Sequence, residues 1–126
     1  MPLKSELFRD DAKLEACAVS NQAHVIPGAA GMHVSKIQTA LVRLNQAVLD
    51  GTEVEHQRYG PSTATAVLRY KQARDIVNRS YQTQADNIVG IMTIARLDSD
   101  MVEWEKQHGN STPIVTREIY CWLVKS

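Results

Sequence analysis

A tyrosine in a strongly polar segment is the first candidate for chemistry in this chain. Tyr81 lies within residues 78–87, together with Asn78, Arg79, Gln82 and Gln84. An aromatic ring can stack on the face of a sugar, while amides bind the sugar's hydroxyl and acetamido groups. Alternatively, the ring inserts into the core and anchors its loop, with the hydroxyl at the surface. The segment is therefore a candidate ligand-binding loop, and both roles of Tyr81 remain open.

A change in the sign of charge lies on either side of this segment. Residues 56–79 contain Arg58, Arg69, Lys71, Arg74 and Arg79 against Asp75. Residues 83–105 contain Arg96 against Asp86, Asp98, Asp100, Glu103 and Glu105. A basic face that includes Lys71 and Arg74 can attract a carboxylate-bearing ligand such as a peptide, because long-range fields concentrate partners of opposite charge. The alternative is solubility together with ion pairs between neighbouring helices.

The residue types used by enzymes and metal sites are not arranged for catalysis. The histidines are His24, His33, His56 and His108. Their spacing is not that of a metal site, so we expect them to be solvated or to cap helices. The acidic residues 98–105 lack the spacing of a calcium loop and predict a solvated helix face. No nucleophile elbow, P-loop or dinucleotide fingerprint occurs. We expect no catalytic residue, no metal site and no cofactor.

Composition places the chain among globular proteins of one domain. It has 126 residues, 44% hydrophobic residues, and 14 basic against 14 acidic residues. The balanced charge gives no reason to expect nucleic acid as a partner, and no apolar run is long enough to span a bilayer. We expect no Sec signal, because charged residues interrupt the first thirty positions. Cys17 and Cys121 predict two buried thiols, with a disulfide between them as the alternative.

A short pattern occurs twice and predicts the start of a helix each time. Thr63 stands three residues after Gly60, and Thr93 stands three residues after Gly90. Apolar residues at helical spacing come after each threonine. Glycine suits the tight turn before a helix, and Pro61 fits the first helical position. The threonine hydroxyl would bind back to the N–H of the glycine, as the acidic member of a capping box does. The residue before each glycine would fold onto the helix.

The periodicity of apolar residues predicts three main helices. The first has Val34, Ile37, Leu41, Leu44 and Val48 on one face and ends at Asp50–Gly51. A polar connector at 52–58 leads to the second helix, whose inner residues are Ala66, Val67, Tyr70, Ala73 and Val77. The third has Ile94, Leu97, Met101 and Trp104 inward and ends at Gly109–Asn110.

The two ends of the chain extend this three-helix core. Near the N-terminus, Asp10 or Asp11 would cap a short helix with Leu14, Cys17 and Ala18 inward. Near the C-terminus, residues 114–124 can form a strand or a closing helix. We divide the chain into an N-terminal arm (1–27), a core (28–98), and the end of the third helix with a C-terminal extension (99–126).

The core resembles the peptidoglycan-binding domain family, a compact three-helix module of bacterial cell-wall enzymes. The resembling residues are Gly31, Val34–Gln38, Leu41, Leu44, Tyr59, Gly60, Thr63, Ala66, Val67, Tyr70, Lys71, Asp86–Gly90, Thr93 and Leu97. Asn87 stands where the family often has glycine, and the connectors 50–58 and 78–87 are long for this module. In the family pattern Tyr59 and Tyr70 correspond to core aromatics. The resemblance implies an all-α fold, a compact bundle with N- and C-terminal extensions.

The same resemblance implies a function without catalysis. The expected function is recognition of peptidoglycan, through its glycan or its peptide stem. Loop 78–87 and the basic face with Lys71 and Arg74 would form the binding surface. The alternative is a protein-interaction adaptor on the same scaffold, linked to a Sec-independent secretion system. The expected location is the cytoplasm, or outside it after Sec-independent export.

Overall fold

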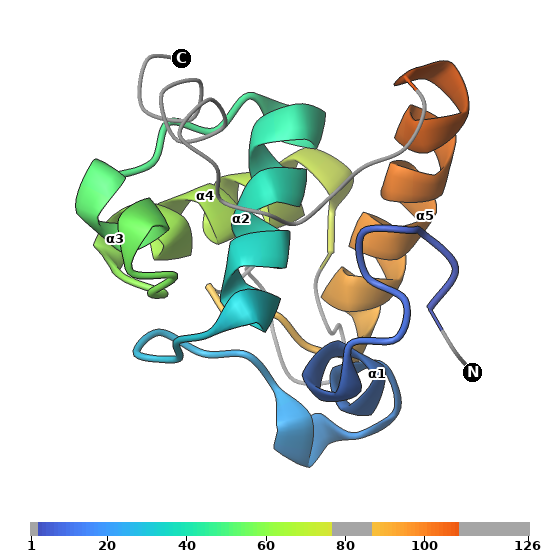
Figure 1. Cartoon of the computed structure of the whole chain (residues 1–126), viewed down its shortest axis with the longest axis horizontal. Helices are drawn as coiled ribbons and strands as arrows, with labels where there is room; N and C mark the ends of the chain where they lie inside the picture. Colours follow the sequence, from blue (N-terminus) through green and yellow to red (C-terminus); the bar gives the residue numbers. More distant parts are fainter. Residues whose placement is uncertain (1–2, 77–86, 109–126) are drawn as a thin grey trace.

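The computed structural model describes residues 3–76 and 87–108, and this part of the chain is helical (Figure 1). The helices are α1 (Ala12–Val19), α2 (Met32–Asn45), α3 (Gly51–Glu55), α4 (Pro61–Arg74) and α5 (Ile91–His108), with a 3-10 turn at Asn21–Ala23. Within these residues there is no strand, and the pairs Val25–Val89 and Ala30–Arg58 form isolated β-bridges. The predicted all-α class is therefore confirmed for the described part.

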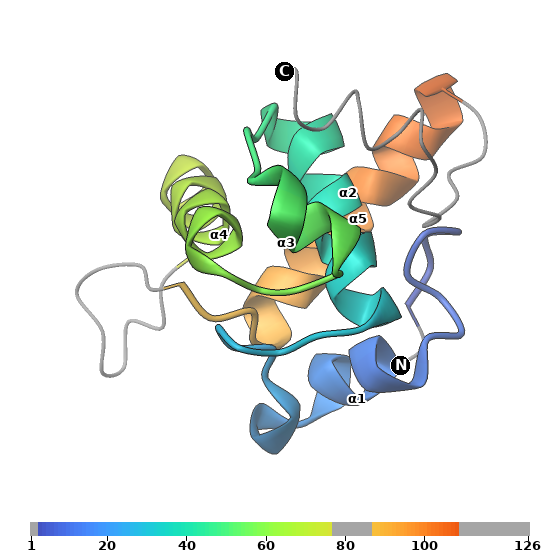
Figure 2. The same ribbon diagram turned by 60° about the vertical axis from the view of Figure 1, so that its left-hand side comes forward.

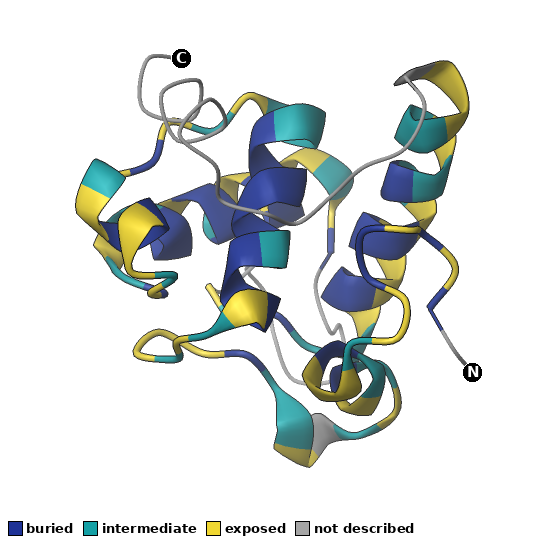
Figure 3. Cartoon of the chain, viewed as in Figure 1, coloured by how far each residue is buried: buried dark blue, intermediate teal, exposed yellow. Residues whose placement is uncertain are grey.

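Helix α2 lies at the centre of the molecule and contacts both α4 and α5, while α1 packs against α5 (Figures 1 and 2). Figure 3 shows buried residues along the inward faces of these helices. The largest fully buried apolar side chains are Leu7, Phe8, Leu14, Ile37, Leu41, Tyr59, Tyr70, Ile94, Leu97 and Met101. The arm and the three main helices thus contribute to one hydrophobic cluster. No described helix is long and apolar enough to cross a bilayer.

Helix α1 begins as one of the two sequence alternatives predicts. Asp11 is the N-cap, and its carboxylate accepts hydrogen bonds from the backbone N–H groups of Lys13 and Leu14, both at 3.1 Å. Leu14 and Cys17 are buried, and Ala18 packs against the core. Lys36 of α2 forms an ion pair with Asp11 at 3.0 Å, which ties the two helices together.

Helix α2 ends earlier than the sequence predicts. Gln46 adopts the left-handed conformation with φ 52°, and its N–H bonds to carbonyls of the last turn. The expected end at Asp50–Gly51 is wrong, because Asp50 instead caps α3 by accepting hydrogen bonds from Thr52 and Glu53. Val48 consequently lies beyond the helix and is 65% exposed. The predicted polar connector at 52–58 is likewise wrong, since it contains most of α3.

Helices α4 and α5 largely follow the predicted periodicity. Pro61 occupies the first turn of α4, and the predicted inner residues Ala66, Val67 and Tyr70 are buried. Asp75 in the left-handed conformation ends α4. Ala73, in the last turn of α4, is exposed, so its predicted inward position is wrong. In α5, Ile94, Leu97 and Met101 are buried and Trp104 packs partly buried against them, as predicted. Val77, residues 109–110 and segment 114–124 lie outside the described residues.

Segment 25–31, which contains a turn closed by a hydrogen bond from the N–H of Ala29 to the carbonyl of Ile26 at 3.1 Å, connects the chain segments that lead into α4 and α5. Val25 and Val89 exchange two backbone hydrogen bonds of 2.9 Å. Tyr59 donates its N–H to the carbonyl of Ala29 and accepts from the N–H of Gly28, both at 2.8 Å. Gly31 ends the segment as the N-cap of α2 with φ 134°, a conformation that strongly favours glycine. Segment 25–31 therefore holds Tyr59 and Val89, the residues that precede the glycines at the starts of α4 and α5.

The N-terminal segment, residues 3–8, is held by carboxylates of α1 and α5. Asp98 accepts hydrogen bonds from the N–H groups of Lys4 and Ser5 at 2.8–3.1 Å, and it is only 7% exposed. Glu105 accepts from Glu6 and Leu7 at 2.9 and 3.0 Å. The predicted solvated face of α5 is therefore wrong for these two acids. Backbone donors in a buried, non-helical segment require acceptors, and these carboxylates supply them.

Candidate functional site

The residues predicted to bind a ligand are only partly described. Asn78, Arg79, Tyr81, Gln82 and Gln84 lie outside the described residues, so their predicted roles stay predictions. Lys71 and Arg74 of the predicted basic face are described, and both make contacts within the protein.

Lys71 is an interior residue of α4. Its side chain is 6% exposed, and its ammonium donates a hydrogen bond of 2.9 Å to the carbonyl of Ile88. Ile88 precedes α5, so the contact attaches α4 to the segment that leads into α5. Lys71 therefore stabilises the packing of these two elements and is poorly placed to contact a ligand.

Arg74 joins three helices through its guanidinium group. Its Nε contacts Asp100 of α5 at 3.3 Å, and its Nη1 donates to the side chain of Asn45 at the end of α2 at 3.0 Å. The guanidinium lies 4.4 Å from the centre of the Tyr70 ring, and the Tyr70 hydroxyl donates to Asp100 at 2.6 Å. Burial and this contact with Asp100 raise the pKa of Tyr70 well above its usual value. For Arg74 the structure shows the interhelical ion pair, the second of the two alternatives.

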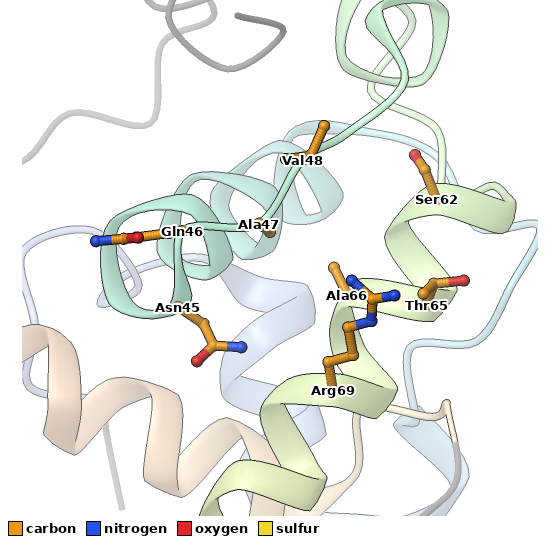
Figure 4. Close-up of a pocket in the computed structure, with 8 residues that line it drawn as sticks. All are labelled: Asn45, Gln46, Ala47, Val48, Ser62, Thr65, Ala66 and Arg69. Atoms are coloured by element: carbon orange, nitrogen blue, oxygen red, sulfur yellow. The ribbon is translucent and has the colours of Figure 1, made fainter. Parts of the chain in front are cut away.

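A groove between the end of α2 and the outer face of α4 is a candidate binding site (Figure 4). Its volume is about 350 Å³. One wall comes from the turn that follows α2 and the other from successive turns of α4. The lining residues are Asn45, Gln46, Ala47, Val48, Ser62, Thr65, Ala66 and Arg69.

The shape of this groove depends on the left-handed turn at Gln46. The turn directs residues 47–50 away from the axis of α2 and toward the first turn of α4. There the N–H of Asp50 donates a hydrogen bond of 2.8 Å to the Ser62 hydroxyl, which closes one end of the groove. Leu49 is buried and anchors the turn, while the neighbouring Val48 remains at the surface.

The groove offers hydrogen-bonding groups, apolar contact and one positive charge. Figure 4 shows the Arg69 side chain extending from α4 past Ala66 toward Thr65. Thr65 and Arg69 are exposed, and Val48 provides an apolar surface opposite them. Such a surface can bind a polar ligand that carries methyl groups and an anionic group. It contains no arrangement of acid, base and nucleophile.

The wall formed by α4 is supported by a buried carboxylate. Glu53 of α3 is 5% exposed and accepts hydrogen bonds from the N–H groups of Gly60, Ser62 and Thr63 at 3.0–3.1 Å. These N–H groups lack partners within the helix, and the positive end of the helix dipole favours a carboxylate there. Burial by itself raises the pKa of Glu53, but the hydrogen bonds from Ser62 and Thr63 lower it below the usual value overall.

The role predicted for Thr63 is therefore wrong. Its hydroxyl donates to Glu53 at 2.8 Å and accepts from the amide of Gln38 at 3.1 Å, and Glu53 supplies the acceptor for the N–H of Gly60. Gln38 also donates to the carbonyl of Arg58 at 3.0 Å. Glu53 lies seven residues before Gly60 in the sequence, and the fold brings its carboxylate to the start of α4. The pattern of glycine and threonine therefore did not indicate Glu53.

The two pattern glycines are favoured by close contacts, strongly at Gly60 and weakly at Gly90, and not by unusual backbone angles. Gly60 has φ −102°, which other residues also adopt. A Cβ there would lie 2.6 Å from the carboxylate carbon of Glu53. A Cβ at Gly90 would lie 3.2 Å from Nε2 of His24. Tyr59 and Val89, the residues before them, are buried as predicted.

The described histidines and cysteine form no catalytic or metal site. His56 is exposed as expected, but His33 is 7% exposed, so the expectation of a solvated or capping role is wrong for it. Burial lowers the pKa of His33. Cys17 is a buried free thiol that contacts the carbonyl of Val89 at 3.3 Å, and burial raises its pKa to about 11. Among the described residues no group of histidine, cysteine and acidic side chains could hold a metal.

Sequence reasoning missed most of this groove. It included Arg69 in the basic run, but it did not indicate that Asn45, Val48 and Thr65 lie near it. The missing signal is the turn at Gln46, since glutamine gives little indication of a left-handed conformation. The periodicity gave no clue to the earlier end of α2, because Val48 also fits the face of a continued helix.

Comparison with known proteins identifies no relative. The chain matches no family model, and neither the curated proteins nor the solved structures give a significant match. The geometry of the fold and of the groove, together with the sequence resemblance, is therefore the basis for a functional proposal.

Proposed function

We propose that this protein is a non-catalytic module that binds bacterial cell-wall peptidoglycan. The proposed site is the groove between the end of α2 and α4. The predicted contribution of loop 78–87 stays a prediction beside it. The buried Lys71 and the paired Arg74 are assigned to the scaffold.

The arrangement of helices supports this proposal. The three segments that carry the resemblance form α2, α4 and α5, and both later helices contact α2. Gly60 and Gly90 immediately precede α4 and α5, and the aromatic residues of the pattern, Tyr59 and Tyr70, are buried. Because a fold alone does not determine function, the proposal also requires a surface with suitable chemistry.

The observation that carries the proposal is the composition of the groove. Hydroxyl and amide groups from Thr65 and Asn45 can bind the hydroxyl and acetamido groups of a glycan or the backbone of its peptide stem. Val48 offers apolar contact to methyl groups, and Arg69 offers a positive charge to a carboxylate. Peptidoglycan presents all of these groups on one polymer.

Retention on purified murein sacculi tests the proposal. Wild-type protein should sediment with the sacculi at low salt. Thr65→Trp, which fills the groove from an exposed position of α4, should leave most of the protein in the supernatant. Ala16→Trp is the matched control, because Ala16 is an exposed helical residue on α1, outside the groove. Both variants should keep the wild-type circular dichroism spectrum.

Whether wild-type protein is retained distinguishes peptidoglycan binding from the adaptor function. Loss of retention in Thr65→Trp alone would support this groove. Equal retention of both variants would place binding elsewhere on the protein, and no retention of wild type would contradict the proposal and favour the adaptor function.

A further inference from the structure

Arg69 differs from Arg74 and Arg96 in its contacts with acidic side chains. It is the single charged side chain among the groove residues. It is exposed, and among the described residues it forms no ion pair or side-chain hydrogen bond. By contrast, Arg74 and Arg96 both contact Asp100, at 3.3 and 3.1 Å. Helix α4 thus carries Arg74 in an ion pair outside the groove, whereas Arg69 within the groove has no ion pair among the described residues.

The carboxylates near the groove are engaged in other contacts. Glu53 is occupied by the N–H groups of the first turn of α4, and Asp50 caps α3. Asp100 receives Tyr70, Arg74 and Arg96. Among the described residues, none of these carboxylates forms an ion pair with Arg69, which is the single charged side chain that lines the groove.

The groups around Arg69 suit a carboxylate with neutral, partly apolar neighbours. Thr65 lies one turn before Arg69 on the same face of α4, and its hydroxyl can donate to the same anion. Val48 on the opposite wall can contact a methyl group beside the carboxylate. An arginine fork binds a carboxylate with two parallel hydrogen bonds, which gives both affinity and orientation.

We propose, on the basis of the proposed function, that the groove binds a carboxylate of peptidoglycan through Arg69, and that uncharged glycan is not its ligand. Two sources supply this chemistry. One is the terminal carboxylate of the peptide stem. The other is the lactyl carboxylate of muramic acid, which is free where the stem has been removed.

Binding to defined cell-wall fractions tests this assignment. The fractions are intact sacculi, glycan strands whose stems an amidase has removed, and insoluble chitin, which has the same acetamido sugar and no carboxylate. Wild type should bind sacculi and not chitin. Arg69→Gln should weaken binding to sacculi about ten- to a hundredfold, the range for a hydrogen bond to a charged group. Arg58→Gln is the matched control, because Arg58 is also exposed and lies outside the groove.

Competition identifies the source of the carboxylate. If the stem supplies it, free stem peptide should displace the protein from sacculi and the peptide with an amidated C-terminus should not. If the lactyl group supplies it, stripped glycan strands should bind more strongly than intact sacculi. Arg69→Gln binding as tightly as wild type, or wild type binding chitin equally well, would overturn the assignment while leaving peptidoglycan binding intact. No binding of wild type to any wall fraction would instead remove the proposed function.

Discussion

The starts of α4 and α5 share a sequence pattern but are stabilised by different neighbours. Each has a buried residue, a glycine and then a buried threonine, and each is attached to segment 25–31 by backbone hydrogen bonds. At α4 the glycine faces the carboxylate of Glu53, which binds three N–H groups of the turn. At α5 the glycine faces the imidazole of His24. A repeated local motif can therefore fix the backbone path while the fold supplies different partners.

The largest expected effect is the loss of the carboxylate at α4. Glu53→Ala should lower the free energy of unfolding by about 3 kcal/mol, because it leaves several buried donors of the turn without an acceptor. Urea unfolding at pH 7 measures this change. Glu55→Ala, an exposed residue of the same helix, is the control and should change stability by less than about 0.5 kcal/mol. Equal effects of the two substitutions would mean that Glu53 does not support this turn.

Substituting alanine for each of the two glycines should lower the free energy of unfolding by different amounts at the two turns. Gly60→Ala should cost about 2 kcal/mol, because its Cβ would displace a carboxylate that is held by hydrogen bonds. Gly90→Ala should change stability by less than about 1 kcal/mol, since the His24 ring has only a few tenths of an ångström to yield and alanine restricts the unfolded chain. Thermal and urea unfolding of both variants give the comparison. A greater cost at Gly90 would contradict it, and His24→Ala should relieve any cost that appears there.

The last prediction concerns how the stability of wild type and of Glu53→Gln depends on pH. Hydrogen bonds hold the pKa of Glu53 below its usual value, so its contribution to stability is present above about pH 4.3 and is lost as the pH falls through the folded pKa. Glu53→Gln should therefore be less stable than wild type at pH 7 by about 1 kcal/mol. This difference should narrow as the pH is lowered toward 3. Urea midpoints of both proteins across this range provide the measurement, and a constant difference would show that the charge of Glu53 is unimportant.

The sequence predicted the helices better than it predicted their connections. In each of α2, α4 and α5, apolar residues recur at the spacing of one helix face. Ile37, Tyr70 and Leu97 are examples, one from each helix, and their inward positions follow from that spacing. Asp50 and Glu53 are polar residues in a polar stretch, and their sequence neighbours suggest a solvated loop. Glu53 accepts hydrogen bonds from the N–H groups of Ser62 and Thr63, and the N–H of Asp50 donates to the Ser62 hydroxyl; only the tertiary fold brings these groups near one another. Caps supplied from another element cannot be inferred from local sequence.

The same limitation explains why the acids of α5 and most of the groove were missed. Asp98 and Glu105 have the spacing of a solvated helix face, but they bind backbone groups of the N-terminal segment more than ninety residues away in sequence. The groove requires the turn at Gln46, for which the sequence provides no glycine or asparagine. Arg69 could be recognised as basic from the sequence, whereas its lack of an ion pair within the described part of the chain depends on the contacts that Glu53 and Asp100 make elsewhere.

Segment 25–31 acts as a spacer of fixed length. Three residues lie between Val25, which bonds to Val89, and Ala29, which bonds to Tyr59, so the backbone sets how far apart two helices begin. Additional residues between Val25 and Ala29 would move one helix relative to the other. The wall of the groove formed by α4 would move with it, although the insertion would contact no part of that groove. Tolerance of chain-length changes should therefore be lowest in this short stretch, which contributes neither a helix nor a groove residue.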